Sequence, residues 1–170
     1  MENTNYLSDD LKDEAVVFYP GEGEELALSS GRVTLKVTST LSNDQLGVYE
    51  IMLKPGTIGA RLHYHRFMDE TFIVQKGVLT IQLRDKDVEV PAGSVAYVPR
   101  MTPHGFCNRS GEEVVLNLLF NPGQHREGFF RGLKEILAEE PIDPQKYLAL
   151  YQKYDSHPLD TAQMLPVPQA

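Results

Sequence analysis

The sequence has a single cysteine, no run of basic residues and no long hydrophobic run, and each absence excludes a class of protein. Cys107 alone cannot form an intramolecular disulfide, which excludes a disulfide-stabilised secreted scaffold. The formal net charge is -8, from 16 Lys and Arg against 24 Asp and Glu, which disfavours nucleic acid or an anionic membrane as a partner. No apolar run approaches the roughly 18 residues that a membrane-spanning helix needs.

The amino terminus, Met1–Asn5, has no cationic start followed by an apolar stretch, so no signal peptide is expected. The remaining composition is that of an ordinary globular protein, with 41% hydrophobic and 24% charged residues in a chain of 170. A chain of this length is expected to form one domain with a substantial hydrophobic core. The sequence therefore predicts a soluble, cytoplasmic protein.

Short alternating segments separated by glycine and proline turns follow one another from Val16 onward. Val33, Leu35 and Val37, for example, alternate with polar residues at a period of two, which is typical of a half-buried strand. Many short strands at this spacing favour a β-sandwich or barrel over alternating βα units. Strands are expected at 33–37, 49–53, 71–75, 79–83, 88–90, 95–98 and 113–120.

The pattern changes after Gly123, where apolar residues recur at helical spacing. One helix is expected within 124–139, ended by Pro141, and a shorter one within 144–154. The predicted organisation is therefore an amino-terminal arm (1–15), an all-β barrel (16–123) and a helical appendage with a tail (124–170).

Two of the five histidines are His63 and His65, which lie two positions apart on a predicted strand. Positions i and i+2 of a strand point to the same face, so the two imidazoles can converge on a metal ion. The segment after them is long enough to turn the chain and bring Glu70 alongside, and His104 follows the turn at 99–103. These four side chains are the candidate metal ligands.

The glycines and prolines around these residues resemble the two motifs of the cupin superfamily. The first motif reads His63-x-His65-x4-Glu70-x6-Gly77, and the second reads Gly93-x5-Pro99-x-Met101-x2-His104-x3-Asn108. The chain departs from the family pattern at Met101, where the family usually has glycine. Because glycine supplies a positive φ at low cost, a somewhat different turn is expected there.

The resemblance implies a cupin double-stranded β-helix, or jelly-roll barrel, that holds one divalent transition metal ion. His63, His65, Glu70 and His104 are the positions that match the family's ligands. Three neutral imidazoles and one carboxylate suit Fe, Mn, Ni, Co, Cu or Zn, and leave open positions for a substrate or dioxygen.

Strand parity places further residues on the inner wall, where a small-molecule substrate would bind. Phe72 and Val74 share the face of Glu70, while Phe106 shares that of His104, and together they form an apolar wall. Asn108 lies on the same face as His104, and Arg61 on the face of His63, where a cation could hold a substrate carboxylate. Each of these residues also has a purely structural interpretation, as barrel core or as a solvent-reaching arginine. Cys107 has the opposite parity from His104 and is expected to be a small buried hydrophobe.

The segment from Phe120 to Leu133 resembles small single-domain cupins related to bacterial quercetinases, in which a helix packs across the barrel mouth or its outer face. Phe129, Phe130 and Leu133 either cap the pocket or simply bury the helix on the sheet, and the second interpretation is favoured.

The resemblance implies a metal-dependent dioxygenase acting on a small, partly aromatic, flavonol-like or enol-like substrate, with Glu70 as both ligand and catalytic base. That second role requires a Glu70 pKa near neutrality. One alternative is a non-redox isomerase or decarboxylase, in which the metal only polarises a carbonyl or carboxylate. Another is a cupin that binds a small ligand without turnover.

Both parities of the predicted strand at 114–120 are largely apolar, apart from Asn117. A strand that is apolar on both faces needs a cover, supplied either by a partner subunit or by the chain's own amino-terminal strands. A homodimer is the expected assembly, and light scattering at micromolar concentration tests it.

Overall fold

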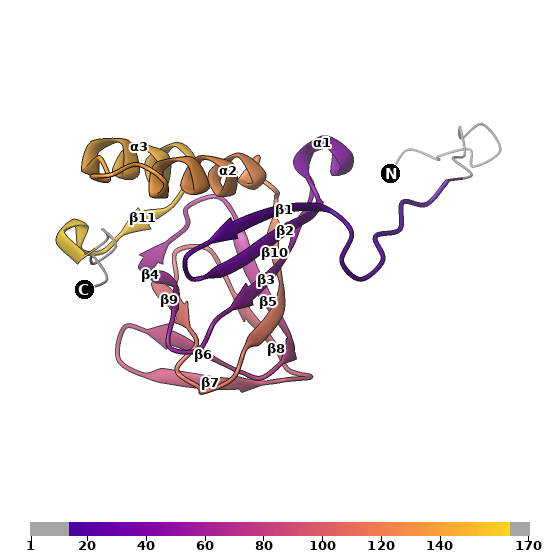
Figure 1. Ribbon diagram of the computed structural model, residues 1–170, viewed down its shortest axis with the longest axis horizontal. Coiled ribbons are helices and arrows are strands. Elements are labelled where there is room, and N and C mark those ends of the chain that lie inside the picture. Colours follow the sequence, from indigo (N-terminus) through magenta and orange to yellow (C-terminus); the bar gives the residue numbers. More distant parts are fainter. Residues whose placement is uncertain (1–13, 164–170) are drawn as a thin grey trace, which may run out of the picture.

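Two antiparallel sheets curl around a common core in the computed structural model, which describes residues 14–163 (Figure 1). The first sheet has the order β1-β2-β3-β10-β5-β8 and the second the order β11-β4-β9-β6-β7. The strands are β1 (Glu24–Leu28), β2 (Gly31–Val37), β3 (Gly47–Leu53), β4 (Ile58–Tyr64), β5 (Asp69–Lys76), β6 (Val78–Leu83), β7 (Asp87–Pro91), β8 (Val95–Val98), β9 (His104–Cys107), β10 (Val114–Asn121) and β11 (His157–Pro158). This architecture confirms the predicted all-β barrel.

The core is built by strict alternation along the central strands. In β10, Val114, Leu116, Leu118 and Phe120 are buried, while the residues between them are only partly buried. β10 lies between β3 and β5, with Leu116 opposite Ile51 on one side and Val74 on the other. The period of two that predicts these strands is therefore also what fills the barrel interior.

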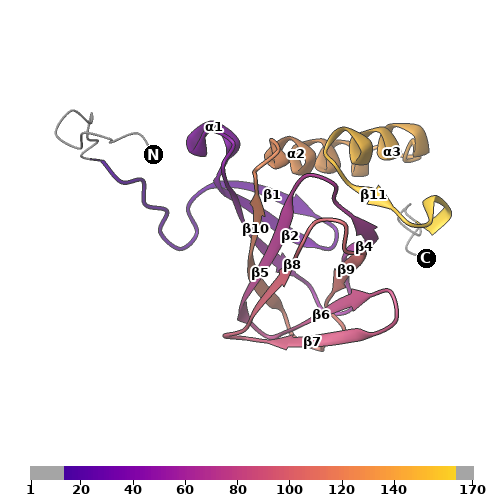
Figure 2. The ribbon, with the colours of Figure 1, turned by 180° about the vertical axis from the view of Figure 1, so that it is seen from behind.

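Two helices, α2 (Arg126–Leu137) and α3 (Pro144–Lys153), lie side by side across one end of the barrel, and β7 lies at the opposite end (Figures 1 and 2). Asp143 caps α3 by accepting from the backbone N–H groups of Gln145 and Lys146, and Pro144 occupies the first helical turn. A short helix, α1 (Ser39–Ser42), and a 3-10 turn at Thr161–Gln163 complete the described elements. None of the helices in the described part of the chain is both long and apolar enough to cross a membrane.

The predicted elements agree with the structure to within a few residues. The strand expected at 113–120 is Val114–Asn121, and the helix expected within 124–139 is Arg126–Leu137. The strands at Glu24–Leu28 and His157–Pro158 and the short helix at Ser39–Ser42 are additions that the sequence pattern missed. Of the predicted amino-terminal arm, residues 1–13 lie outside the described part of the chain.

The outer face of β10 gave the reason to expect a homodimer. Val115, Asn117 and Leu119, which point to that face, are partly buried within the chain itself. The homodimer stays a prediction.

The turn before β9 keeps a left-handed residue without using glycine. Met101 has φ 67°, the backbone region that glycine enters most easily, and its side chain points to solvent with 62% of the residue exposed. Its N–H donates to the carbonyl of His65 at 2.7 Å, which ties the turn to the end of β4. Met101 therefore occupies a positive-φ position like the one glycine would fill, at some conformational cost.

Candidate metal centre

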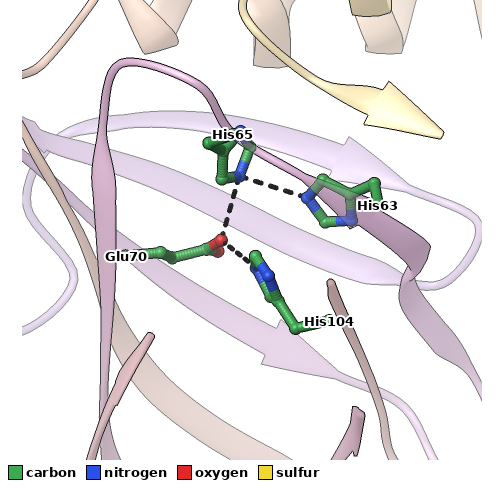
Figure 3. Close-up of side chains that lie close together, drawn as sticks. All are labelled: His63, His65, Glu70 and His104. Carbon is green, nitrogen blue, oxygen red and sulfur yellow. Dashed lines mark hydrogen bonds and ion pairs between the residues drawn. The ribbon is translucent and has the colours of Figure 1, made fainter. Parts of the chain in front are cut away.

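Four side chains converge inside the barrel: three come from strands and the fourth comes from the residue that follows one of these strands (Figure 3). His63 belongs to β4, and His65 follows that strand's last residue. Glu70 lies near the start of β5, and His104 is the first residue of β9, directly opposite His63 in the β4–β9 ladder. All four are at least 98% buried, and one ligand atom of each lies within 4.8 Å of those of the others.

The separations between these atoms match the edges of a coordination sphere. His63 Nε2 lies 3.2 Å from His65 Nε2, which lies 3.1 Å from Glu70 Oε2, and His104 Nε2 lies 2.6 Å from that same oxygen. Donors bound to one ion at about 2.0–2.2 Å are about 3 Å apart when adjacent. The cluster therefore has the size that a transition metal ion requires.

The outer nitrogens of the three imidazoles fix which nitrogen faces the centre. Each Nδ1 lies against a backbone carbonyl: that of Arg61 for His63 (2.7 Å), of Asp155 for His65 (2.6 Å) and of Thr102 for His104 (2.8 Å). Because a carbonyl only accepts, each Nδ1 must carry the hydrogen. In the neutral rings the Nε2 lone pairs then point at one another, an arrangement that a central cation stabilises. The residues present thus fit a bound divalent metal ion.

Charge in the cluster is divided unequally among its members. Burial lowers the pKa of His63 well below its usual range, and the neighbouring rings of His65 and His104 lower it further. Burial also lowers the pKa of His65, against the opposing effect of Glu70. Burial opposes ionisation of Glu70, but His104 and His65 outweigh it and hold the pKa of this carboxyl well below 4.5. Burial likewise lowers the pKa of His104, but Glu70 outweighs it and raises that pKa above 6.5.

The direction of the Glu70 shift bears on its expected catalytic role. A general base in this position was expected to have a pKa near neutrality, and the structure gives the opposite direction. A carboxylate that stays ionised beside His65 and His104 is suited to holding a cation. The structure therefore supports Glu70 as a candidate ligand and gives no support to the expectation of a raised pKa.

We expect the affinity for a metal ion to fall about tenfold for each unit by which the pH is lowered, in the range just below pH 6.5. In this range His104, whose pKa is raised, holds a proton on Nε2 that an incoming ion must displace, while His63 and Glu70, whose pKa values are lowered, hold none. Zinc titrations against a competing chelator, between about pH 5.5 and 7.5, measure the number of protons released. One proton per ion is expected at the start of the decline, and a release of three would contradict the assigned shifts.

Asp155, which comes after α3, positions His65 from a distance of 90 residues along the chain. Its carbonyl accepts from His65 Nδ1, and its buried carboxylate accepts from the backbone N–H groups of Arg66 (3.0 Å) and Phe67 (2.8 Å). His157 also contacts this carboxylate, with Nε2 at 3.1 Å from Oδ1. The carboxy-terminal segment thereby holds the loop that carries His65.

Replacing Asp155 with asparagine is expected to destabilise the protein by roughly 1–3 kcal/mol. Oδ2 accepts from both N–H groups, and an amide oxygen can take its place, but the amide nitrogen that then replaces Oδ1 cannot accept from the N–H of Arg66. Asparagine still tolerates the positive φ of 56° at this position, so backbone strain does not confound the result. Metal affinity is expected to fall about tenfold, since the carboxylate that anchors the loop after His65 is weakened. Chemical denaturation and metal titration measure the two effects. The exposed Asp85, replaced in the same way, is the matched control, and equal behaviour of the two variants would contradict this role.

An apolar cavity opens beside the cluster and reaches two of its members, His63 and Glu70. Phe129, Phe130 and Leu133 of α2 line it, as do residues of both sheets. Phe129 and Phe130 belong to the hydrophobic core and Leu133 packs against it, as the favoured expectation has it, and all three also form part of the cavity wall. The further lining residues include Val33, Ile51, Leu53, Ala60, Phe106, Leu118, Phe120, Arg126 and Tyr151.

The five residues predicted to contact substrate fall into four groups, the last of which is Asn108. Phe106 lines the cavity, whereas Phe72 and Val74 are buried in the core and are not part of the cavity lining; the Phe72 ring packs edge-on to Phe106, with ring centroids 5.3 Å apart. Arg61 lines a separate hollow with Leu159 and Asp160 rather than this cavity.

Asn108 is buried, but its side chain is occupied by the backbone. Its amide donates to the carbonyls of Leu53, Lys54 and Glu112, and its oxygen accepts from the N–H and hydroxyl of Ser110. The structure thus gives Asn108 a task in loop anchoring rather than at the cavity.

Three imidazoles and a carboxylate converge inside the double-sheet β-barrel, beside an apolar cavity. The molecule is therefore a β-barrel protein with a candidate metal centre. Sequence comparison identifies the barrel: residues 49–120 match the family described as Cupin domain. This region, which contains His63, His65, Glu70 and His104, is therefore similar to the cupin domain.

Among curated proteins, the chain is similar to quercetin 2,3-dioxygenase of Bacillus subtilis, with 28% identity over 140 residues. The match covers 80% of this chain but only 41% of the relative, so the chain spans about two fifths of that protein's length.

Solved structures agree on the fold. KdgF from Halomonas sp. superposes with a TM-score of 0.55 at 17% identity, covering 63% of this chain and 94% of that one. The polyketide cyclase RemF from Streptomyces resistomycificus gives 0.56 at 16% identity, covering 64% and 80%. Oxalate decarboxylase from Bacillus subtilis gives 0.51 at 21% identity, covering 59% and 28%. At these identities the likeness concerns architecture alone.

Proposed function

We propose that this protein is a metal-dependent oxygenase acting on a small, partly aromatic organic substrate. The observation that carries the proposal is the apolar cavity that meets the candidate metal centre at His63 and Glu70. The similarity to quercetin 2,3-dioxygenase points to the same class of chemistry. A divalent metal held by His63, His65, Glu70 and His104 would supply Lewis-acid and redox chemistry at the cavity wall.

The chain's own residues would bind and enclose the substrate. Phe106, Phe129 and Phe130 offer aromatic surface, and Leu118 and Leu133 extend it. Because α2 covers this end of the barrel, its side chains would limit the access of water to the reacting groups. Such a cavity favours a hydrophobic ring with few polar groups.

Dioxygen uptake tests the proposal directly. The protein is purified without oxygen, loaded separately with Fe, Mn or Ni, and mixed with flavonols and related enols. Consumption of dioxygen that depends on both metal and substrate supports an oxygenase. No uptake by a fully metallated sample with any of the three metals contradicts it.

A non-redox decarboxylase or isomerase is the second candidate, and one observation favours it. The buried cation Arg126 lines the same cavity, which suits a substrate that carries a carboxylate. Release of carbon dioxide, or isomerisation, without dioxygen uptake would support this alternative. Binding without turnover is the weaker reading, because the cavity leaves the His63 and Glu70 side of the centre accessible.

A further inference from the structure

Arg126, the first residue of α2, is a buried cation without an anionic partner in direct contact. Only 4% of the residue is exposed, and no carboxylate of the described residues lies within 4 Å of its nitrogens. Burial lowers the pKa of Arg126, against the opposing effect of Glu70. A buried charge that lacks a partner is costly, so its persistence calls for a reason.

The hydrogen bonds of Arg126 all leave from one corner of the guanidinium. Nη1 donates to the carbonyl of Tyr154 at 2.8 Å and to Ser156 Oγ at 2.9 Å. Neither Nε nor Nη2 donates a hydrogen bond to another of the described residues. The edge formed by Nε and Nη2 is one that binds a carboxylate through two parallel hydrogen bonds.

Aromatic rings hold the guanidinium in place. Its Cζ lies 3.8 Å from the centroid of the Phe129 ring, 4.9 Å from that of Phe120 and 5.8 Å from that of Phe130. These contacts and the two bonds of Nη1 fix the group before any ligand arrives, which lowers the entropic cost of binding.

The cavity that Arg126 lines has a positive balance inside an acidic protein. Its charged lining residues among those described are Arg32, Arg126 and Glu70, with His63 beside them. Arg32 lies 3.7 Å from each of Glu25 and Glu50 and is thereby compensated. Glu70 is engaged by His65 and His104. Arg126 is thus the cation of this cavity that remains available to a ligand.

We propose that Arg126 is a substrate-binding residue that holds the carboxylate of a small organic acid, whose apolar body lies against Phe106, Phe129 and Phe130. The inference rests on the proposed use of this cavity as the substrate pocket, and it narrows the substrate class to apolar, singly charged carboxylic acids. It also assigns to Arg126 the carboxylate-holding role considered for Arg61 from the sequence.

Matched acids and amides test the proposal in protein loaded with zinc, which has no redox chemistry and permits binding without turnover by an oxygenase. Benzoate, phenylacetate and 3-phenylpropionate are each compared with the corresponding amide by calorimetry. At least one acid is expected to bind about tenfold or more tightly than its amide, the effect of a hydrogen bond to a buried charge. In Arg126→Met this preference is expected to disappear while the amide still binds.

A control variant separates charge recognition from structural effects. Arg131→Met changes an exposed arginine on the same helix, paired with Glu24, and is expected to keep the acid preference. If Arg126→Met does not fold, Arg126→Lys keeps the charge but loses the two-pronged edge, and its acid preference is expected to fall severalfold.

Two results would overturn the proposal. One is the absence of any acid preference in the unaltered protein with all three pairs. The other is a preference that survives unchanged in Arg126→Met, which would mean that the metal holds the carboxylate. Neither result depends on dioxygen uptake, so failure of the oxygenase proposal and failure of this one are distinguished.

Discussion

Replacing both His63 and His104 with alanine is expected to reduce the bound metal from about one ion per chain to nearly none. Changing a residue that only orients a ligand costs about 10–100-fold in affinity, so loss of two ligand nitrogens costs more than 100-fold. Thermal unfolding should show the same loss, because an ion present at about 1,000 times its dissociation constant stabilises the folded state by about 4 kcal/mol. Elemental analysis after gel filtration measures the metal content.

The matched control for this variant is His125→Ala. The side chain of His125 is 71% exposed at the start of α2, so its removal leaves the cluster intact. Equal metal content in the double variant and this control would contradict the assigned ligands. Circular dichroism of both variants without added metal establishes that the barrel is folded.

Glu70→Gln is expected to lower metal affinity by about 100-fold or more while keeping the shape of the side chain. The amide removes the negative charge that offsets a divalent ion, in a position where only 2% of the residue is exposed. The same variant removes the anion that raises the pKa of His104, so the proton released on metal binding near pH 6.5 should also disappear.

This substitution separates the two roles expected of Glu70. A ligand gives a variant that loses metal and activity together. A catalytic base that is not needed for binding gives a variant that keeps its metal and loses only turnover. Full metal occupancy in Glu70→Gln would therefore contradict the interpretation drawn from the lowered pKa of this carboxyl.

The barrel strands and the pairing of His63 with His65 were predictable because their signals are local. Alternation along β3 and β10 follows from the pleat of a strand, and the spacing of His63 and His65 follows from the same period. The meeting of Glu70 and His104 with this pair was predictable only through the resemblance to the cupin motifs, since the residues come from separate strands.

The cavity wall was less predictable because packing between distant segments decides it. Arg61 shares the strand face of His63, yet it lines a different hollow, so parity alone does not place a long side chain. Helical spacing predicts α2 but does not reveal that Phe129 and Phe130 would face the metal cluster's cavity.

Arg126 and Asp155 were missed because no spacing links them to the motifs. Asp155 contacts His65 across 90 residues of sequence, and Arg126 enters the cavity only because α2 packs over the barrel end. Their one local signal is position: Arg126 begins a helix directly after the last barrel strand, and Asp155 follows a helix directly before β11. A charged residue in such a junction is common on surfaces, so the pattern alone does not distinguish it.

A crystal structure with manganese in excess, with anomalous scattering recorded near the metal edge, tests the metal centre most directly. One peak is expected inside the barrel, about 2.0–2.3 Å from the Nε2 atoms of His63, His65 and His104 and from a carboxylate oxygen of Glu70. A fully soaked crystal with no peak between these four side chains, or with the ion bound elsewhere, would contradict it.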